Sequence, residues 1–286
     1  MKVQYNENYV ASGYAFDTTR KAAAIARSLL DDPIEGVTIE DPGPPLTAGT
    51  IIQEVHGERY LRALETGTPR WLAEGQGFDW DDMILPMAQA HATGLVIATH
   101  DALSNGSSGG SLSSGLHHAS RDRGAGFCTI NGLAVAVTAA HIMGAGRVLV
   151  LDFDAHCGGG TFSILEDDPG FVQVDVSVVR YDEWTPTGDH YLDIGGRDGY
   201  VQRIDRALQH ADGLGGFDLI LYNAGMDPIN SGVSRMLVQE RERMVREFVA
   251  GTPAVFALAG GYTSLRHSMD DVVEWHRMTI REWARL

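Results

Sequence analysis

Three side chains that could bind a metal ion alternate along one short stretch of the chain. Asp152, Asp154 and His156 occur two residues apart in the run VLDFDAHCGGGT. Residues spaced by two on a β-strand point to the same face, so these three should emerge together from a strand that is otherwise apolar. Left unpaired, they would be costly to bury. Carboxylate plus imidazole suits a divalent ion, zinc first, if a further ligand comes from elsewhere. The alternative is a polar network that only caps the strand end.

Two more apolar runs end in residues that could complete such a site. LILYNAGMDP places Asp227 just after one run, and AVFALAGGYT places Tyr262 just after another. Ligands of open α/β sheets gather at the carboxyl ends of the strands, so we expect all of these side chains at one edge. His117 and His118 are adjacent in a glycine-flanked loop. A tandem pair in such a loop is less easily explained as structural than an isolated histidine.

The elements that must position these residues follow an α/β pattern. From about residue 147 onward, short apolar runs alternate with helical patterns, the runs being RVLVLDFDAH, FVQVDVSVV, FDLILYNAG and AVFALAGG. Apolar runs without alternation, separated by helices, are typical of a parallel sheet covered on both faces. We therefore predict an α/β fold in which residues 1–286 form a single domain with a mostly parallel sheet and helices on both faces.

The first half of the chain is expected to be more helical. Helical patterns cover residues 18–32, 47–64 and 81–103, and short strands are expected at KVQYN and GVTIE. The tract NGSSGGSLSSG, residues 105–115, has the composition of a flexible linker and could mark a domain boundary. Because the chain runs on into a long apolar helical pattern, we interpret the tract as a loop inside one domain.

Composition limits the classes of partner. The chain has 286 residues and a net charge of −16, with 44% hydrophobic residues, as in ordinary globular proteins. This charge argues against nucleic acid and anionic membranes as partners, because both need clustered Lys and Arg. It would favour a cationic substrate, or it serves only solubility. Two cysteines, no apolar leader and no stretch of membrane-spanning length lead us to expect a reduced, cytoplasmic protein. A homo-oligomer is left open.

These motifs resemble those of the histone deacetylase family, which has the arginase/deacetylase fold. The resemblance rests on GLHHA followed by GFCTIN, on DFDAH followed by GGGT, on AGMD and on GGYT, in the family's order. Weaker likeness in EVHGERYLRAL and in the loop DVSVVRYDEWTPTGD extends it over nearly the whole chain. The resemblance implies one zinc ion per chain, bound by Asp154, His156 and Asp227. It also implies a monovalent cation, usually potassium, beside the same strand and completed by backbone near Ser177.

The resemblance further implies catalytic roles. His118 resembles the family's general base, and His117 resembles its neighbour, held by Asp152. The Tyr262 hydroxyl resembles the donor to the oxyanion that develops on the substrate carbonyl. In that mechanism the base takes a proton from water and later gives it to the leaving amine, while the zinc ion polarises the amide carbonyl.

A substrate tunnel is implied as well. Gly126 and Phe127 resemble the part of the acyl-lysine tunnel where glycine leaves room and an aromatic ring packs on the alkyl stem. Trp184 or Thr185 stands where a second aromatic wall usually lies.

Two positions depart from the family pattern. The family usually has histidine where this chain has Cys157, and Asp or Asn where it has Gly159. In the family the second of these positions orients the second histidine of the tandem pair. We therefore expect His118 to lack its usual partner.

The implied function is zinc-dependent hydrolysis of a linear amide, with release of an acyl group, most simply acetyl, from an amine. Acetyl-lysine in proteins, acetylpolyamines and small acylated amines all fit this description. One alternative is a non-catalytic relative that binds acylated amines. Another is an arginase-like enzyme with two manganese ions, which would need further carboxylates that DFDAHCGG does not offer after His156. The presence of the zinc ligands, the tandem histidines and the tyrosine together favours the hydrolase.

Overall fold

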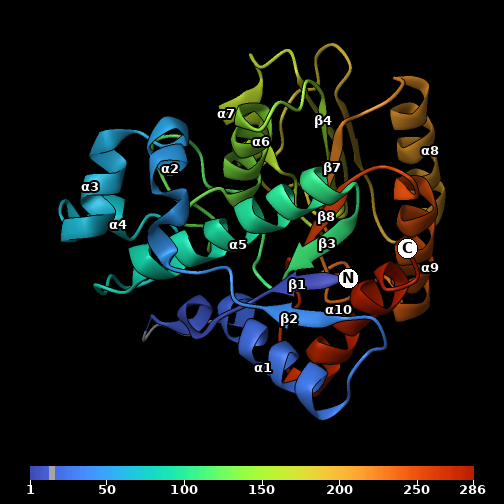
Figure 1. Cartoon of the computed structure of the whole chain (residues 1–286), viewed down its shortest axis with the longest axis horizontal. Helices are drawn as coiled ribbons and strands as arrows, with labels where there is room; N and C mark the ends of the chain where they lie inside the picture. The colour runs from blue at the N-terminus through green and yellow to red at the C-terminus, as the bar shows by residue number, and fades with distance from the viewer. Residues whose placement is uncertain (13–16) are drawn as a thin grey trace.

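The computed structural model describes residues 1–12 and 17–286, and within them one sheet organises the chain (Figure 1). It has eight strands in the order β2-β1-β3-β8-β7-β4-β5-β6, and all its strand pairs are parallel. The strands are β1 (Lys2–Gln4), β2 (Thr38–Glu40), β3 (Ser108–Ser111), β4 (Val148–Asp152), β5 (Phe171–Ser177), β6 (Tyr191–Ile194), β7 (Leu219–Asn223) and β8 (Ala254–Ala257). The predicted α/β class with a parallel sheet is confirmed.

Helices cover both faces of this sheet. They are α1 (Asp17–Asp31), α2 (Gly49–Val55), α3 (Glu58–Thr66), α4 (Arg70–Ala73), α5 (Ile84–Asn105), α6 (Gly132–Ile142), α7 (Gly159–Leu165), α8 (Tyr200–Gly213), α9 (Arg235–Val249) and α10 (Met269–Trp283). In β4, Leu149 and Leu151 pack with residues of α1, α8, α9 and α10, whereas Val148 and Val150 pack with residues of α5 and α6. Burial on both faces explains why the strands read as unbroken apolar runs. No helix in the described ranges is long and apolar enough to cross a membrane.

The glycine- and serine-rich tract contains a strand, so our interpretation of it as a loop was wrong. β3 pairs with β1 on one side and with β8 on the other. A Cβ atom added to Gly110 would lie 2.4 Å from the Phe256 ring, and one added to Gly109 would lie 2.9 Å from the Lys2 carbonyl oxygen. The neighbours of β3 thus fill the space that its own side chains would need, and composition alone could not reveal this.

The helical pattern over residues 47–64 forms two helices rather than one. His56, between α2 and α3, has an extended backbone with φ −112° and ψ 145°. Its ring accepts a hydrogen bond from the Asn131 backbone N–H at 3.0 Å. Gly57 donates its own N–H to the Arg121 carbonyl at 2.9 Å. Contacts with the segment that precedes α6 therefore interrupt the helix.

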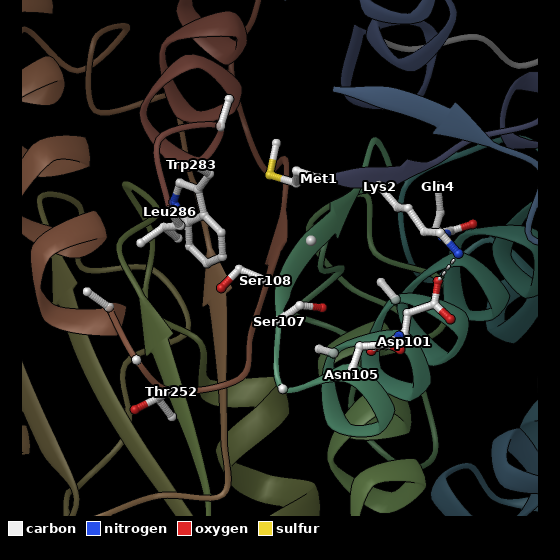
Figure 2. A pocket seen from close by; sticks show the side chains of 17 residues that line it. Met1, Lys2, Gln4, Asp101, Asn105, Ser107, Ser108, Thr252, Trp283 and Leu286 are labelled. Atoms are coloured by element: carbon white, nitrogen blue, oxygen red, sulfur yellow. Dashed lines mark hydrogen bonds and ion pairs between the residues drawn. The ribbon is translucent and has the colours of Figure 1, made fainter. Parts of the chain in front are cut away.

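A surface cavity of about 680 Å³ borders the amino ends of β3 and β8 (Figure 2). Lys2 and Asp101 form an ion pair at 3.3 Å on its wall, and Trp283 and Leu286 line it from the C-terminal end of the chain. The side chains that the sequence marks for chemistry follow the opposite, carboxyl ends of the strands. This cavity is therefore not the candidate active site.

A buried histidine should make the fold sensitive to acid. His91 of α5 stacks on Tyr9 and lies 2.9 Å from the Tyr9 carbonyl oxygen through Nε2. Burial lowers the pKa of His91 to about 4, from an ordinary 6.5. The unfolded chain therefore binds a proton below pH 6.5 that the folded chain does not bind, and stability falls as the pH drops from 6.5 toward 4.

We expect the His91→Gln variant to lose less stability than the wild type between pH 7.5 and pH 5.5, by about 1 kcal/mol. Urea unfolding at both pH values measures this difference. His100→Gln is the matched control, because His100 lies on the same helix with an exposed side chain. Equal pH dependence in wild type and His91→Gln would contradict the assignment.

Candidate active site

Five of the residues singled out in the sequence end or follow three adjacent strands at their carboxyl edge. Asp152 ends β4, and Asp154 and His156 follow it. Asp227 follows β7, and Tyr262 follows β8. Since β8, β7 and β4 are neighbours in the sheet, their ends bring Asp154, His156 and Asp227 to one place and put Tyr262 on the segment that leaves the same edge.

Asp154, His156 and Asp227 form a compact set of metal-ligand atoms. One ligand atom from each lies within 4.8 Å of the other two. His156 Nδ1 is 3.2 Å from Asp154 Oδ1 and 3.0 Å from Asp227 Oδ2. Both carboxylates are buried and His156 is partly buried. Two carboxylates and an imidazole that face one another are a donor set that suits zinc and leaves a further position open.

Three further observations support a cation at this place. Asp227 Oδ2 is buried without a hydrogen bond, its near neighbour being the His156 imidazole. Burial and the adjacent Asp154 raise the pKa of Asp227, as expected for two carboxylates crowded together without a cation. A Cβ atom added to Gly260 would lie 2.5 Å from Asp227 Oδ1, so glycine gives the carboxylates room. The residues present therefore fit a divalent ion.

The tandem histidines lie beside this set, and their rings are in contact at 3.9 Å between centroids. His117 Nδ1 lies 2.7 Å from Asp152 Oδ2, and His117 Nε2 lies 3.6 Å from Asp154 Oδ1. His118 Nδ1 lies 2.9 Å from Asp182 Oδ2. Donation from Nδ1 to a carboxylate leaves the Nε2 atom of a neutral imidazole with a free lone pair. His118 thus has the tautomer that a general base requires.

The two histidines differ sharply in pKa. Burial acts to lower the pKa of His117, but the charges of Asp152 and Asp154 outweigh it and raise the pKa to about 10. Burial and the adjacent His117 lower the pKa of His118 to about 4. Opposite environments for two neighbouring titratable groups are typical of an acid and base pair. The carboxylates beside His117 therefore favour its charged form, whereas burial and the adjacent His117 favour the neutral form of His118.

His118 lacks the family's usual partner at position 159, as expected, but a different carboxylate contacts its ring. Position 159 is glycine, as the sequence showed, but Asp182 from the loop after β5 supplies a carboxylate. Asp182 Oδ2 also accepts a hydrogen bond from the Gly160 backbone N–H at 2.9 Å. A loop distant in sequence has therefore replaced the neighbour that we looked for close to His156.

A glycine and a tyrosine ring lie against His118, the second of the tandem histidines. A Cβ atom added to Gly126 would lie 2.4 Å from the His118 ring and 3.1 Å from the Tyr181 ring. Phe127 follows with φ +64° and stacks on Phe78 at 5.5 Å between ring centroids. The Tyr181 ring meets the His118 ring edge-on at 4.9 Å and is 44% exposed. Gly126 thus lies against the His118 ring, while the place of Gly126 and Phe127 in a substrate tunnel stays a prediction.

Trp184 is not part of this aromatic surface. It is buried, stacks on Phe162 at 4.2 Å and donates its Nε1–H to Asp175 Oδ2 at 3.1 Å. Its ring therefore packs in the core behind the loop, and Tyr181 occupies the place beside the site that we had assigned to Trp184. The other residue considered there, Thr185, is exposed.

Tyr262 is held through its backbone at the end of β8. Its N–H donates to Asn230 Oδ1 at 3.0 Å, and its carbonyl accepts from Asn230 Nδ2 at 2.9 Å. Gly260, in the turn before it, has φ +53° and accepts hydrogen bonds from the buried Lys21 ammonium and, at 3.2 Å, from His276. Helices α1 and α10 thus fix the turn that carries Tyr262.

Backbone strain gathers around the same place. Among the described residues, positive φ outside glycine occurs at Leu116, Phe127 and Asp182, with values of 55°, 64° and 59°. Leu116 directly precedes the tandem histidines. Such conformations are uncommon and are maintained mainly where surrounding structure over-determines them, often at functional sites.

The sequence analysis missed two residues of the site, Tyr181 and Asp182. Both lie in the loop DVSVVRYDEWTPTGD, which follows β5 at the same edge of the sheet as the metal-ligand set. An aromatic residue and a carboxylate just past a buried strand were a usable signal. The monovalent cation stays a prediction, and the Ser177 carbonyl near its expected place accepts from Arg203 at 2.9 Å and from the Gly195 N–H at 3.1 Å.

Comparison with known proteins decides the family. The model of the histone deacetylase domain matches residues 17–217. The chain belongs to the histone deacetylase family. An uncharacterized protein of Picosynechococcus sp. is 29% identical over 83% of this chain and 83% of its own length. A probable deacetylase of Methanothermobacter thermautotrophicus is 30% identical over 56% of this chain and 48% of its own length.

A solved structure shares the fold of this chain. The acetylpolyamine aminohydrolase of Burkholderia pseudomallei superposes with a TM-score of 0.80 at 18% identity, over 99% of this chain and 98% of that one. The arginase/deacetylase-like architecture expected from the sequence is therefore confirmed.

The metal-ligand set leads to a direct binding prediction. We expect the wild-type chain to hold one tightly bound zinc ion and Asp154→Ala, His156→Ala and Asp227→Ala to lose it, because each substitution removes a ligand from a three-residue set. Elemental analysis of the purified proteins measures the content. Asp198→Ala, at a fully exposed carboxylate, is the control and should keep the metal. Unchanged zinc in all three variants would refute the site.

Proposed function

We propose that this protein is a zinc-dependent hydrolase of linear amides that removes an acyl group, most simply acetyl, from an amine. The observation that carries the proposal is the arrangement of His118, with a carboxylate on Nδ1, beside the compact set of Asp154, His156 and Asp227. A metal-ligand set with an adjacent oriented base is what hydrolysis of an unactivated amide needs.

A zinc ion bound by Asp154, His156 and Asp227 would polarise the substrate carbonyl and acidify water. His118 Nε2 accepts the proton of the attacking water as its oxygen adds to the carbonyl carbon. The same nitrogen then returns the proton to the amine nitrogen as the C–N bond breaks, which releases a carboxylic acid and a free amine. His117, fixed by Asp152, lies beside this base as a positive charge next to the negative charge that develops on the substrate.

Tyr262 is proposed as a further donor to the developing oxyanion. Its backbone is clamped by Asn230, and its side chain follows the glycine turn that packs on Asp227. A donor that is already in place costs no reorganisation when the charge appears. The narrow stem of the substrate would lie between Phe127 and Tyr181, the rings that flank Gly126.

Relatives support the choice of an acylated amine as substrate. One relative described above is named a probable deacetylase, and the solved structure is named an acetylpolyamine aminohydrolase. The net charge of −16 would favour a cationic amine product or substrate. Acetyl-lysine, acetylpolyamines and small acylated amines are accordingly the substrate classes that we propose.

A substrate panel tests the function. The zinc-loaded protein should hydrolyse at least one of three groups of substrates: acyl-lysine peptides, acetylpolyamines and small acylated amines. Release of the free amine measures the reaction. Hydroxamates should inhibit it because they bind at an open metal position, and strong chelators should inhibit it because they remove the metal. Hydrolysis that is inhibited by neither hydroxamates nor chelators would exclude the zinc mechanism. Zinc binding without any hydrolysis would favour the non-catalytic alternative.

Removal of the Tyr262 hydroxyl should distinguish donation to the oxyanion from binding of the metal. Tyr262→Phe keeps the ring and deletes the donor, so kcat should fall by roughly 10²- to 10³-fold, as for loss of one oxyanion donor elsewhere. Zinc content and KM should stay close to the wild-type values. Steady-state kinetics together with metal analysis measures both. Wild-type turnover in this variant would remove Tyr262 from the mechanism.

A further inference from the structure

We infer that Asp182 is the positioning residue of the His118 base, and that the loop after β5 supplies it in place of the side chain absent at position 159. The inference rests on the proposed hydrolase function. It goes further by assigning a role to Asp182, to which the family resemblance gives none. It also explains Gly159 and Asp182 together, because Asp182 supplies the carboxylate that a glycine at position 159 cannot.

Space around Gly159 provides the first argument. A Cβ atom added there would lie 2.3 Å from the Asp182 carbonyl oxygen and 2.7 Å from Asp182 Oδ1. These separations are far below van der Waals contact. The backbone and carboxylate of Asp182 therefore occupy the volume into which a side chain at position 159 would project, and glycine is required while the loop lies here.

Hydrogen bonding provides the second argument. Asp182 Oδ2 accepts from His118 Nδ1 and from the Gly160 N–H, each at 2.9 Å. Gly160 is also packed against the backbone of the tandem histidines, because a Cβ atom there would lie 2.5 Å from the His117 carbonyl oxygen. One carboxylate oxygen thus links the histidine ring to the start of α7 and fixes the direction of the ring.

The backbone of the loop provides the third argument. Asp182 has φ +59°, a conformation that side chains other than Asn and Asp rarely adopt. The loop is pinned just before it, since the Cys157 N–H donates to the Tyr181 carbonyl at 3.0 Å. Such a conformation costs free energy, and the hydrogen bond to His118 is the interaction that this conformation makes possible. The Tyr181 ring and the Asp182 carboxylate, which are adjacent in this loop, both contact His118.

Two substitutions at position 182 test the inference. Asp182→Gly deletes the carboxylate and tolerates positive φ, and Asp182→Asn keeps the shape without the charge. We expect kcat to fall by about 10²-fold in both variants, the lower end of what a general base contributes, with KM and zinc content close to wild type. Added formate should restore part of kcat in Asp182→Gly, where a small anion can enter, but not in Asp182→Asn. A residue that only supported the loop would not respond to formate in this selective way.

The neighbouring carboxylate provides a matched control. Glu183 is exposed and pairs with Arg180, so Glu183→Gln should retain wild-type kcat and ignore formate. A spectroscopic readout independent of turnover is the ring N–H proton of His118. We expect it to be observed by NMR in wild type and to be lost in Asp182→Gly, with His118→Ala identifying the signal.

The outcomes distinguish failure of the proposed hydrolase function from failure of the role inferred for Asp182. If wild type hydrolyses no substrate of the panel, the proposed function fails, and the NMR signal alone still decides whether Asp182 holds His118. If wild type is active and both Asp182 variants keep its kcat, the inference is overturned while the hydrolase function stands. An equal loss of kcat in Glu183→Gln would also overturn it.

Discussion

The burial of negative charge at one edge of the sheet is the constraint on which the site depends. Asp152, Asp154, Asp175 and Asp227 are each at most 3% exposed. Asp175 lies in the last three residues of β5, and the others lie at or beyond the ends of β4 and β7. Carboxylates so buried are tolerated only with compensating charge or donors. His117, backbone N–H groups and the Trp184 indole supply part of this compensation. The glycines around these carboxylates and the tandem histidines follow from the same requirement, because donors and backbone must come close.

Much of this edge could be predicted from the sequence because the local pattern determines it. An apolar run that ends in alternating Asp and His residues specifies a strand, its face and its functional end without knowledge of the rest of the chain. Asp227 and Tyr262 were accessible in the same way, since each follows a buried strand through a glycine turn. Their roles in catalysis remain proposals.

The rest depended on packing between distant segments. The path of the loop after β5 decides that Tyr181 and Asp182 face the histidines and that Trp184 turns into the core, and no local pattern encodes that path. The strand β3 was hidden for a similar reason, because the Phe256 ring of a distant strand occupies the space over Gly110. A sequence pattern shows which chemistry a side chain can perform. The orientation of the residues in the loop after β5, and the strand at Gly110, depend instead on the space left by residues distant in sequence.

The place of β3 in the sheet has a consequence for folding during synthesis. β3 pairs with β1, which precedes it, and with β8, which begins only at Ala254. On the ribosome one edge of β3 therefore stays open until almost the whole chain has emerged, and long-range pairing of this kind is slow. Open strand edges invite association between nascent chains. Because β3 has the sequence Ser-Gly-Gly-Ser, its unpaired edge offers little apolar surface to another chain. The composition that made the strand hard to predict therefore also reduces its tendency to aggregate.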